Sequence, residues 1–284
     1  MVKDSSTNDY DSPGRRYHLY YGADKNYMPT DETEQDRLDL HHEILIQLLD
    51  GKLHLAPIEE PQRILDIGTG TGIWAIDCAD LYPNAEVIGT DLSAIQPTWV
   101  PENLKFEVDD AEAKWPYSSV LQRILVPGGY IELGELSIKA YTDDNTTGPG
   151  FKVMCDLLEK ACHKLGRPVV TEDILWTRLE SAGFVDVVVQ SFKQPYGPWA
   201  KDETLKRIGA MVLLAAKSGA EGYSMAMFTR VLGMSAEEAK KACQDCARDI
   251  KNRNHHSYSP QYVIRCSFKS YCCSIDEILT VSDR

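Results

Sequence analysis

Apolar positions along the chain fall into two patterns, short continuous runs and longer segments with helical spacing. The short runs predict strands at residues 64–67, 86–91, 104–108, 130–133, 184–189 and 262–266. The helical spacing predicts helices at residues 73–81, 151–165, 174–182, 203–216, 223–232 and 236–251. Strands that alternate with helices are typical of an α/β fold, in which helices cover both faces of a mostly parallel sheet.

The pattern also predicts how the chain is divided. A first helix is expected after Asp31, which resembles an N-cap, and before the stop signal at Asp50 and Gly51. Residues 1–16 are polar and predict a flexible arm. We expect one domain over residues 17–266, with a helical insertion at about 201–251 between its last two strands. The tail at 267–284 continues none of these patterns.

Composition narrows the class of protein. The 284 residues are 43% hydrophobic and 26% charged, which is close to the globular average and excludes disorder as the main state. The net charge of −13 argues against a groove for nucleic acid. No apolar stretch approaches the ~20 residues that span a bilayer, and the first residues lack the apolar core of a signal peptide. We therefore expect a cytoplasmic or nuclear protein that is not secreted, does not bind a membrane and keeps its cysteines reduced.

A glycine-rich turn lies between the strand at 64–67 and the helix at 73–81. It reads Asp66-x-Gly68-x-Gly70-x-Gly72. Glycines at such a turn let a ligand approach the N-terminus of the helix, where free N–H groups favour anionic groups. A nicotinamide site usually requires Gly-x-Gly-x-x-Gly, and position 73 is Ile. The spacing is instead the one used for S-adenosylmethionine, although a glycine turn made only for packing remains an alternative.

Acidic residues at the next two strand ends complete the predicted ligand rim. Asp91 ends the strand at 86–91, where a carboxylate can accept both ribose hydroxyls of a nucleoside. This role exists in nicotinamide and S-adenosylmethionine sites alike. Asp110 and Ala111 follow the strand at 104–108, where a side-chain acceptor and a backbone N–H can bind the adenine edge. The carboxyl ends of parallel strands meet at one edge of the sheet, so these groups are expected close together.

Several longer stretches make the sequence similar to a known family. The chain resembles class I methyltransferases and, within that class, the fungal LaeA-like family, over roughly residues 17–265. The stretches that carry the resemblance are 37–42, 49–57, 64–74, 127–133, 143–144 and 228–233.

The resemblance implies both a fold and a function. The fold would be a Rossmann-like, three-layer αβα sandwich whose last strand, at 262–266, runs antiparallel. The methyl donor would be S-adenosylmethionine, held by Asp66, Gly68, Gly70, Gly72, Asp91, Asp110 and Ala111. The setting would be fungal secondary metabolism. There the protein would either methylate a small-molecule acceptor or act as a regulator through protein partners, with weak or lost catalysis.

One segment is too short for the family's pattern. Only seventeen residues separate Asp110 from Gly128, whereas the family places a helix, a strand and a second helix there. Residues 117–126 can hold one helix, so one central strand of the sheet is expected to be missing and activity to suffer. Either the sheet has a gap beside residues 64–67, or residues 130–133 pair directly with them. We expect direct pairing, because a gap would leave backbone groups without partners.

Weaker signals leave their alternatives open. Cys243 and Cys246 have a spacing found in zinc sites, but the same spacing places both on one face of a helix, and no metal site is expected. His42 is either a base near the acceptor or a histidine bonded beside the core. Trp115 could pack beside the adenine or anchor the core. Methyl transfer needs no covalent enzyme intermediate, and the sequence nominates no catalytic residue.

Overall fold

The computed structural model describes residues 9–11, 15–18, 25, 27–112, 128–167, 169 and 171–268. Trp115, the helix predicted at 117–126 and the tail from residue 269 lie outside these residues. Contacts divide the chain into two compact units. We call the first the helical unit; it comprises Met1–Leu48, Ile138–Val169 and Lys193–Ser259. The second, the sheet unit, comprises Leu49–Ser137, Val170–Phe192 and Pro260–Arg284.

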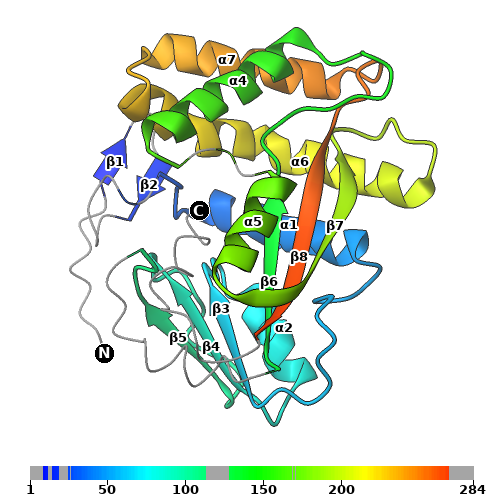
Figure 1. Ribbon diagram of the computed structural model, residues 1–284. Helices are drawn as coiled ribbons and strands as arrows, with labels where there is room; N and C mark the ends of the chain where they lie inside the picture. The colour runs from blue at the N-terminus through cyan, green and yellow to red at the C-terminus, as the bar shows by residue number, and fades with distance from the viewer. Residues whose placement is uncertain are drawn as a thin grey trace. The chain divides into compact units, whose positions relative to one another are not determined.

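Three parallel strands of the sheet unit carry the predicted glycine turn. Their order is β3 (Arg63–Ile67), β4 (Glu86–Asp91) and β5 (Leu104–Val108), as Figure 1 shows in cyan and teal. Helix α2 (Ile73–Leu81) connects β3 to β4. Buried Ala75 and Cys78 of this helix pack with Val87 of β4. The α/β prediction and the bounds of α2, β4 and β5 are confirmed.

A second three-stranded sheet has the order β6-β8-β7. Its strands are β6 (Tyr130–Leu136), β7 (Phe184–Pro195) and β8 (Tyr258–Phe268), and α5 (Glu172–Ser181) precedes β7. Strand β8 runs antiparallel to β6, as the resemblance implies for the last strand. Strands β6, β7 and β8 are longer than their apolar runs predict, because ladder pairing continues past the apolar residues.

The two sheets are separate, and the predicted direct pairing of residues 130–133 with 64–67 is wrong. In the part of the chain that the structure describes, β6 pairs with β8 and β3 pairs with β4. The two sheets meet through side chains instead, since Leu65 of β3 packs against the core formed by α5, β7 and β8. Side-chain packing therefore takes the place of the expected backbone ladder.

Side chains of the second sheet also hold the segment that precedes β3. Glu132 of β6 accepts hydrogen bonds from the backbone N–H groups of Leu55 (2.8 Å) and Ala56 (2.6 Å). Arg265 of β8 donates to the carbonyl of Leu55 at 2.6 Å. Burial raises the pKa of the Glu132 carboxyl, while the two backbone bonds oppose this rise. These contacts fix β6 against residues 55–56 without a ladder to β3.

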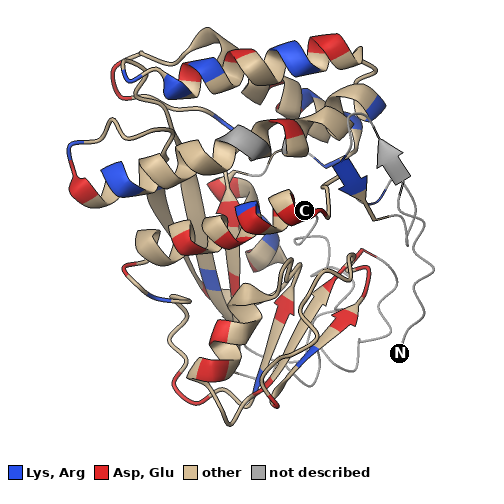
Figure 2. Cartoon of the chain, turned by 180° about the vertical axis from the view of Figure 1, so that it is seen from behind, with Lys and Arg blue, Asp and Glu red and all other residues tan. Residues whose placement is uncertain are grey.

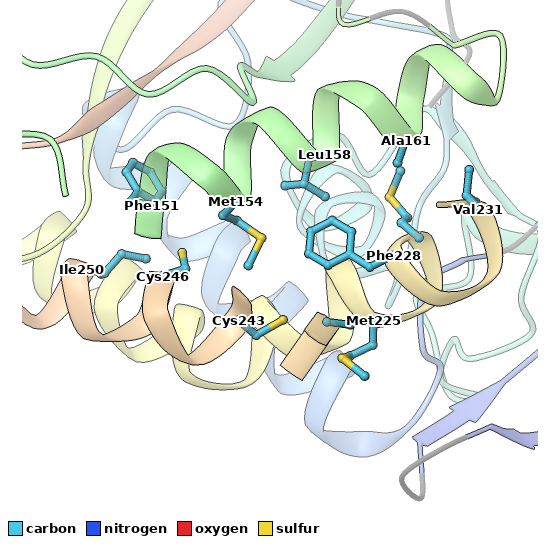
Figure 3. Packing of buried hydrophobic residues seen from close by; sticks show 12 residues of the cluster. Phe151, Met154, Leu158, Ala161, Met225, Phe228, Val231, Cys243, Cys246 and Ile250 are labelled. Atoms are coloured by element: carbon cyan, nitrogen blue, oxygen red, sulfur yellow. The ribbon is translucent and has the colours of Figure 1, made fainter. Parts of the chain in front are cut away.

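The helical unit is built on helices that pack in pairs. They are α1 (Glu32–Leu48), α4 (Pro149–Lys164), α6 (Glu203–Ala226), the π-helical turn η1 (Met227–Val231) and α7 (Ala236–Lys251). Helix α4 lies beside α7, and α1 lies beside α6. In Figure 3, Phe151, Met154 and Leu158 of α4 point toward Phe228 of η1 and Cys246 of α7. This apolar cluster is the core of the helical unit.

Helix α6 is longer than predicted, because two glycines do not interrupt it. The pattern predicts separate helices at 203–216 and 223–232, whereas α6 continues through Gly219 and Gly222 to Ala226. Both glycines lie against arginine side chains. A Cβ at position 219 would lie 2.8 Å from Cδ of Arg37, and one at position 222 would lie 3.0 Å from a guanidinium nitrogen of Arg15. The glycines therefore provide room for two arginines.

The surface of α7 carries both charge signs. Basic and acidic residues alternate along this helix in Figure 2, and Asp245 pairs with Lys241 (2.8 Å) and Arg248 (2.7 Å). A capping box between Ser235 and Glu238 begins the helix.

In the described residues, no helix combines the length and apolar character that crossing a bilayer requires.

Two short strands lie where the sequence predicts a flexible arm. Strand β1 (Asp9–Asp11) pairs antiparallel with β2 (Arg15–Tyr17). Arg15 pairs with Asp31 at 2.6 Å, which links β2 to the start of α1. The rest of the predicted arm before Asp9 lies outside the described residues. The expected single domain over residues 17–266 stays a prediction.

Candidate donor-binding site

The turn after β3 is a left-handed glycine turn held against the end of β4. Gly68, Gly70 and Gly72 have φ values of 74°, 58° and 84°, a region that glycine enters without steric cost. The N–H groups of Gly68 and Thr69 both donate to the carbonyl of Thr90, at 2.8 and 2.9 Å. Inside the turn, the Thr69 hydroxyl donates to Asp66 at 2.6 Å. Asp66 therefore orients the turn that follows it.

Helix α2 begins directly after this turn and has no side-chain cap. Its N-cap is Gly72 in the left-handed region, and the first turn contains no acidic residue. The backbone N–H groups of a helix start lack partners within the helix and carry a partial positive charge. A carboxylate or another anionic group of a ligand fits this end of α2.

Asp91 joins the end of β4 to the glycine turn. Its Oδ2 accepts from the N–H of Gly70 at 2.9 Å, and its Oδ1 accepts from the N–H of Ser93 at 2.9 Å. A ribose would share this carboxylate with the two backbone groups, and a carboxylate offers about four lone-pair directions. The position and chemistry of Asp91 therefore fit the diol of a nucleoside.

Asp110 follows the end of β5 and is buried. Its Oδ1 accepts from the N–H of Glu112 at 2.9 Å, and its own N–H donates to Asp109 at 2.9 Å. The N–H of Asp109 donates to the carbonyl of Asp91, also at 2.9 Å. Ala111 is half-buried in the turn that Asp110 begins. The ends of β4 and β5 are thus tied together, and the predicted residues of all three strand ends meet at one edge.

Two residues of this edge were not found from the sequence. Gln96 donates from Nε2 to the carbonyls of Gly70 (2.6 Å) and Ser93 (2.9 Å). Its only sequence signal is a polar amide between Ile95 and Pro97. Phe106 of β5 lies against Gly72 and Gly89. The sequence contains no signal for Phe106, because the register that brings these strands together is a tertiary property.

Comparison with known proteins shows the family of this chain. Residues 40–121 match a family model described as a methyltransferase domain. Methyltransferase pytC of Aspergillus terreus is 37% identical over 251 residues, which cover 79% of this chain and 77% of that protein. The secondary metabolism regulator LAE1 of Cochliobolus heterostrophus is 34% identical, covering 90% of this chain and 93% of that protein.

The chain belongs to the fungal LaeA-like methyltransferase family.

Among solved structures, the chain is similar to phosphoethanolamine N-methyltransferase 2 of Haemonchus contortus, in complex with S-adenosylhomocysteine. It is 14% identical with a TM-score of 0.47, and the match covers 90% of this chain and 63% of that protein, which is less than two thirds of its length. As a member of the LaeA-like family, this chain is an S-adenosylmethionine-dependent methyltransferase with a Rossmann-like fold. The glycine turn, the uncapped start of α2 and the Asp91 carboxylate fit this methyl donor.

Cys243, Cys246 and His42, whose roles the sequence leaves open, belong to the helical unit. Cys243 and Cys246 are buried in its core on one face of α7, and burial raises the pKa of the Cys243 thiol to about 12. Within the described residues, no group of three or more His, Cys, Asp or Glu side chains is arranged to hold a metal. His42 is buried in α1. Burial lowers the pKa of the neighbouring His41 to about 4, with Arg37 as a further cause.

Proposed function

We propose that this methyltransferase transfers a methyl group from S-adenosylmethionine to a small-molecule acceptor in fungal secondary metabolism. The observation that carries the proposal is the position of Asp91, which ends β4 and bonds to Gly70 of the glycine turn. This contact supports the proposal, because a carboxylate that could accept ribose hydroxyls lies beside a turn and helix start that suit an anionic group. The similarity to pytC, which is named a methyltransferase, supports a tailoring role.

In this proposal the residues of the sheet edge bind and orient the donor. Asp91 accepts the ribose hydroxyls, Asp110 and Ala111 bind the adenine edge, and the start of α2 faces the donor's carboxylate. Asp66 and the three glycines shape the turn between them. When bound, S-adenosylmethionine supplies an activated methyl group on its sulfonium, so placing the acceptor in line with this group carries much of the rate.

Titration calorimetry with S-adenosylhomocysteine tests the proposal. We expect heat of binding for the wild-type chain and weaker binding for Asp91→Ala, by about 1–3 kcal/mol, because the ribose hydroxyls lose their acceptor. Glu86→Ala is the matched control, since Glu86 is an exposed carboxylate at the opposite end of the same strand. A folded wild-type sample that binds no S-adenosylhomocysteine at high protein concentration contradicts the proposal.

The alternative is a regulator of secondary metabolism that acts through protein partners, with weak or lost catalysis. It is favoured by the match to LAE1, which extends over 90% of this chain. Affinity purification from a fungal culture separates the two functions. Stable recovery of nuclear proteins with the chain, in the absence of methylation of any metabolite in extracts, supports the regulator. Methylation of a defined metabolite supports the tailoring enzyme.

A further inference from the structure

Gln96 closes a ring of hydrogen bonds around Gly70 and Ser93. Asp91 accepts the N–H of both residues, one on each carboxylate oxygen, at 2.9 Å. Gln96 donates from its single amide nitrogen to the carbonyl of both, at 2.6 and 2.9 Å. The N–H groups of Gly70 and Ser93 are therefore held by Asp91 at the end of β4, and their carbonyls are held by Gln96 in the loop that follows.

This ring fixes the two peptide planes that meet at Gly70. The N–H of Gly70 belongs to the peptide unit that precedes its Cα, and its carbonyl belongs to the unit that follows. Asp91 holds the first and Gln96 holds the second. Glycine has the largest backbone freedom of all residues, and Gly70 lies in the left-handed region at φ 58°. A turn of alternating glycines therefore depends on outside contacts to keep one conformation.

The same ring orients the Asp91 carboxylate. The N–H of Ser93 binds Oδ1 of Asp91, and the carbonyl of Ser93 is in turn bound by Gln96. Displacement of the Gln96 amide frees the carbonyls of both Gly70 and Ser93 to turn. Each of these residues donates its N–H to Asp91, so the carboxylate would lose its fixed orientation as well.

We propose that Gln96 is a positioning residue for the methyl donor. It preorganises the glycine turn and Asp91 before the donor arrives, and it does so without touching the donor. The inference rests on the proposed role of Asp91 and the turn in donor binding. Preorganisation increases affinity because the ordering of the binding groups does not have to occur on binding.

The two hydrogen bonds require the uncharged amide group of Gln96. One amide nitrogen supplies two N–H donors and carries no charge. A glutamate of the same shape would present carboxylate oxygens to two carbonyls and would repel both. Gln96→Glu therefore removes both bonds with almost no change of volume. Gln96→Met retains the length of the side chain and removes only the polar groups.

The matched control is Gln62→Glu. Gln62 is exposed and lies immediately before β3, in the same unit of the protein. It undergoes the same chemical change, and the same change of net charge, as Gln96→Glu. Any effect of added negative charge on the folded protein or on the ligand is therefore common to both variants.

The experiment measures the affinity for S-adenosylhomocysteine by calorimetry at a temperature where every variant is folded, together with the unfolding temperature without ligand. We expect Gln96→Glu and Gln96→Met to weaken binding roughly tenfold or more. Gln62→Glu should bind as the wild type does. A structural role alone would lower the unfolding temperature and leave the affinity unchanged, and this result overturns the inference.

The same experiment has two further possible results. If neither the wild type nor Gln62→Glu binds S-adenosylhomocysteine, the proposed donor site itself is wrong and the inference falls with it. If both Gln96 variants fail to fold, hydrogen exchange of the wild-type chain decides. The side-chain amide protons of Gln96 should exchange slowly before any ligand is added, because its amide nitrogen donates to two carbonyls, whereas fast exchange shows that these bonds are not formed and overturns the inference.

Discussion

The ring of Phe106 occupies the space where a side chain at Gly72 would begin. A Cβ atom built on Gly72 would overlap the tip of the Phe106 ring, and one built on Gly89 would lie 2.7 Å from the same ring. Phe106 belongs to β5, Gly89 to β4, and Gly72 to the turn before α2. One aromatic side chain therefore requires glycine at two positions that lie far from it in sequence.

We expect Gly72→Ala to destabilise the chain more than Gly68→Ala. Both glycines have positive φ, so both variants incur the cost of about 1–2 kcal/mol for a left-handed alanine. Only alanine at position 72 also meets Phe106, which adds roughly 1–3 kcal/mol, because position 68 has no heavy atom within 4 Å of the added Cβ. Thermal unfolding of the two variants measures the difference. Equal unfolding temperatures would show that the Phe106 ring moves aside at no cost.

The buried carboxylate of Glu34 is expected to be essential for stability. Its side chain is 1% exposed, pairs with Arg37 at 2.6 Å and lies 3.9 Å from Arg15. Glu34→Gln leaves two arginines beside a neutral amide. Removal of one partner from a buried ion pair costs about 3–5 kcal/mol.

Glu32→Gln is the control for this substitution. Glu32 lies two residues earlier in the same helix, is 82% exposed and pairs with Arg16 at 3.3 Å. An exposed pair contributes at most about 1 kcal/mol. Urea unfolding should therefore separate the two variants clearly. A loss for Glu34→Gln no larger than that for Glu32→Gln would show that solvent reaches the arginines.

The Asp144 carboxylate should make stability depend on pH in the acid range. The hydroxyls of Thr146 (2.6 Å) and Thr142 (2.7 Å) and Nδ1 of His256 (2.5 Å) donate to it, and they hold its pKa well below the usual range. A lowered pKa stabilises the folded state above the unfolded value of about 3.9, and this stabilisation is lost as the pH falls below that value. Unfolding temperatures measured from about pH 5 to pH 2 should fall less steeply for Asp144→Asn than for the wild type.

Thr146→Val provides an independent check, because it removes one donor and keeps the carboxyl group. Carbon NMR of the aspartate carboxyls should show the pKa of Asp144 moving up toward its ordinary value in this variant. If Asp144 of the wild type already titrates near about 3.9, the hydroxyl bonds are absent in solution.

The short segment between β5 and β6 should affect catalysis more than adenine binding. The sheet that carries the glycine turn is not continued by β6 in the described residues. In the proposed site the start of α2, which follows β3, would face the carboxylate at the methionine end of the donor, and Asp110 would bind the adenine end. Compared with a family member that has the full helix-strand-helix segment, we expect this chain to bind S-adenosylhomocysteine measurably but more weakly. We also expect its turnover to be low. Methylation of a defined acceptor at the median enzyme rate of about 10 s⁻¹ would contradict this prediction.

Local pattern alone predicted the elements around the donor site. The bounds of α2, β4 and β5 agree with the apolar runs and the glycine punctuation, because neighbouring residues determine both. The parallel arrangement places the ends of consecutive strands at one edge. Asp91 and Asp110 could therefore be expected beside the glycine turn before the structure was known.

The tertiary structure decided what depends on contacts between remote segments. Gly219 and Gly222 of α6 leave room for the side chains of Arg37 and Arg15 from the N-terminal part of the chain, and helical spacing does not reveal these contacts. The separation of the two sheets depends on which backbone groups find partners, and hydrophobic runs do not specify this choice. Gln96 bonds to Gly70 across 26 residues. The hydrophobic pattern of a sequence predicts which residues are buried. A hydrogen bond between distant residues forms only because the packing of the folded chain brings them together.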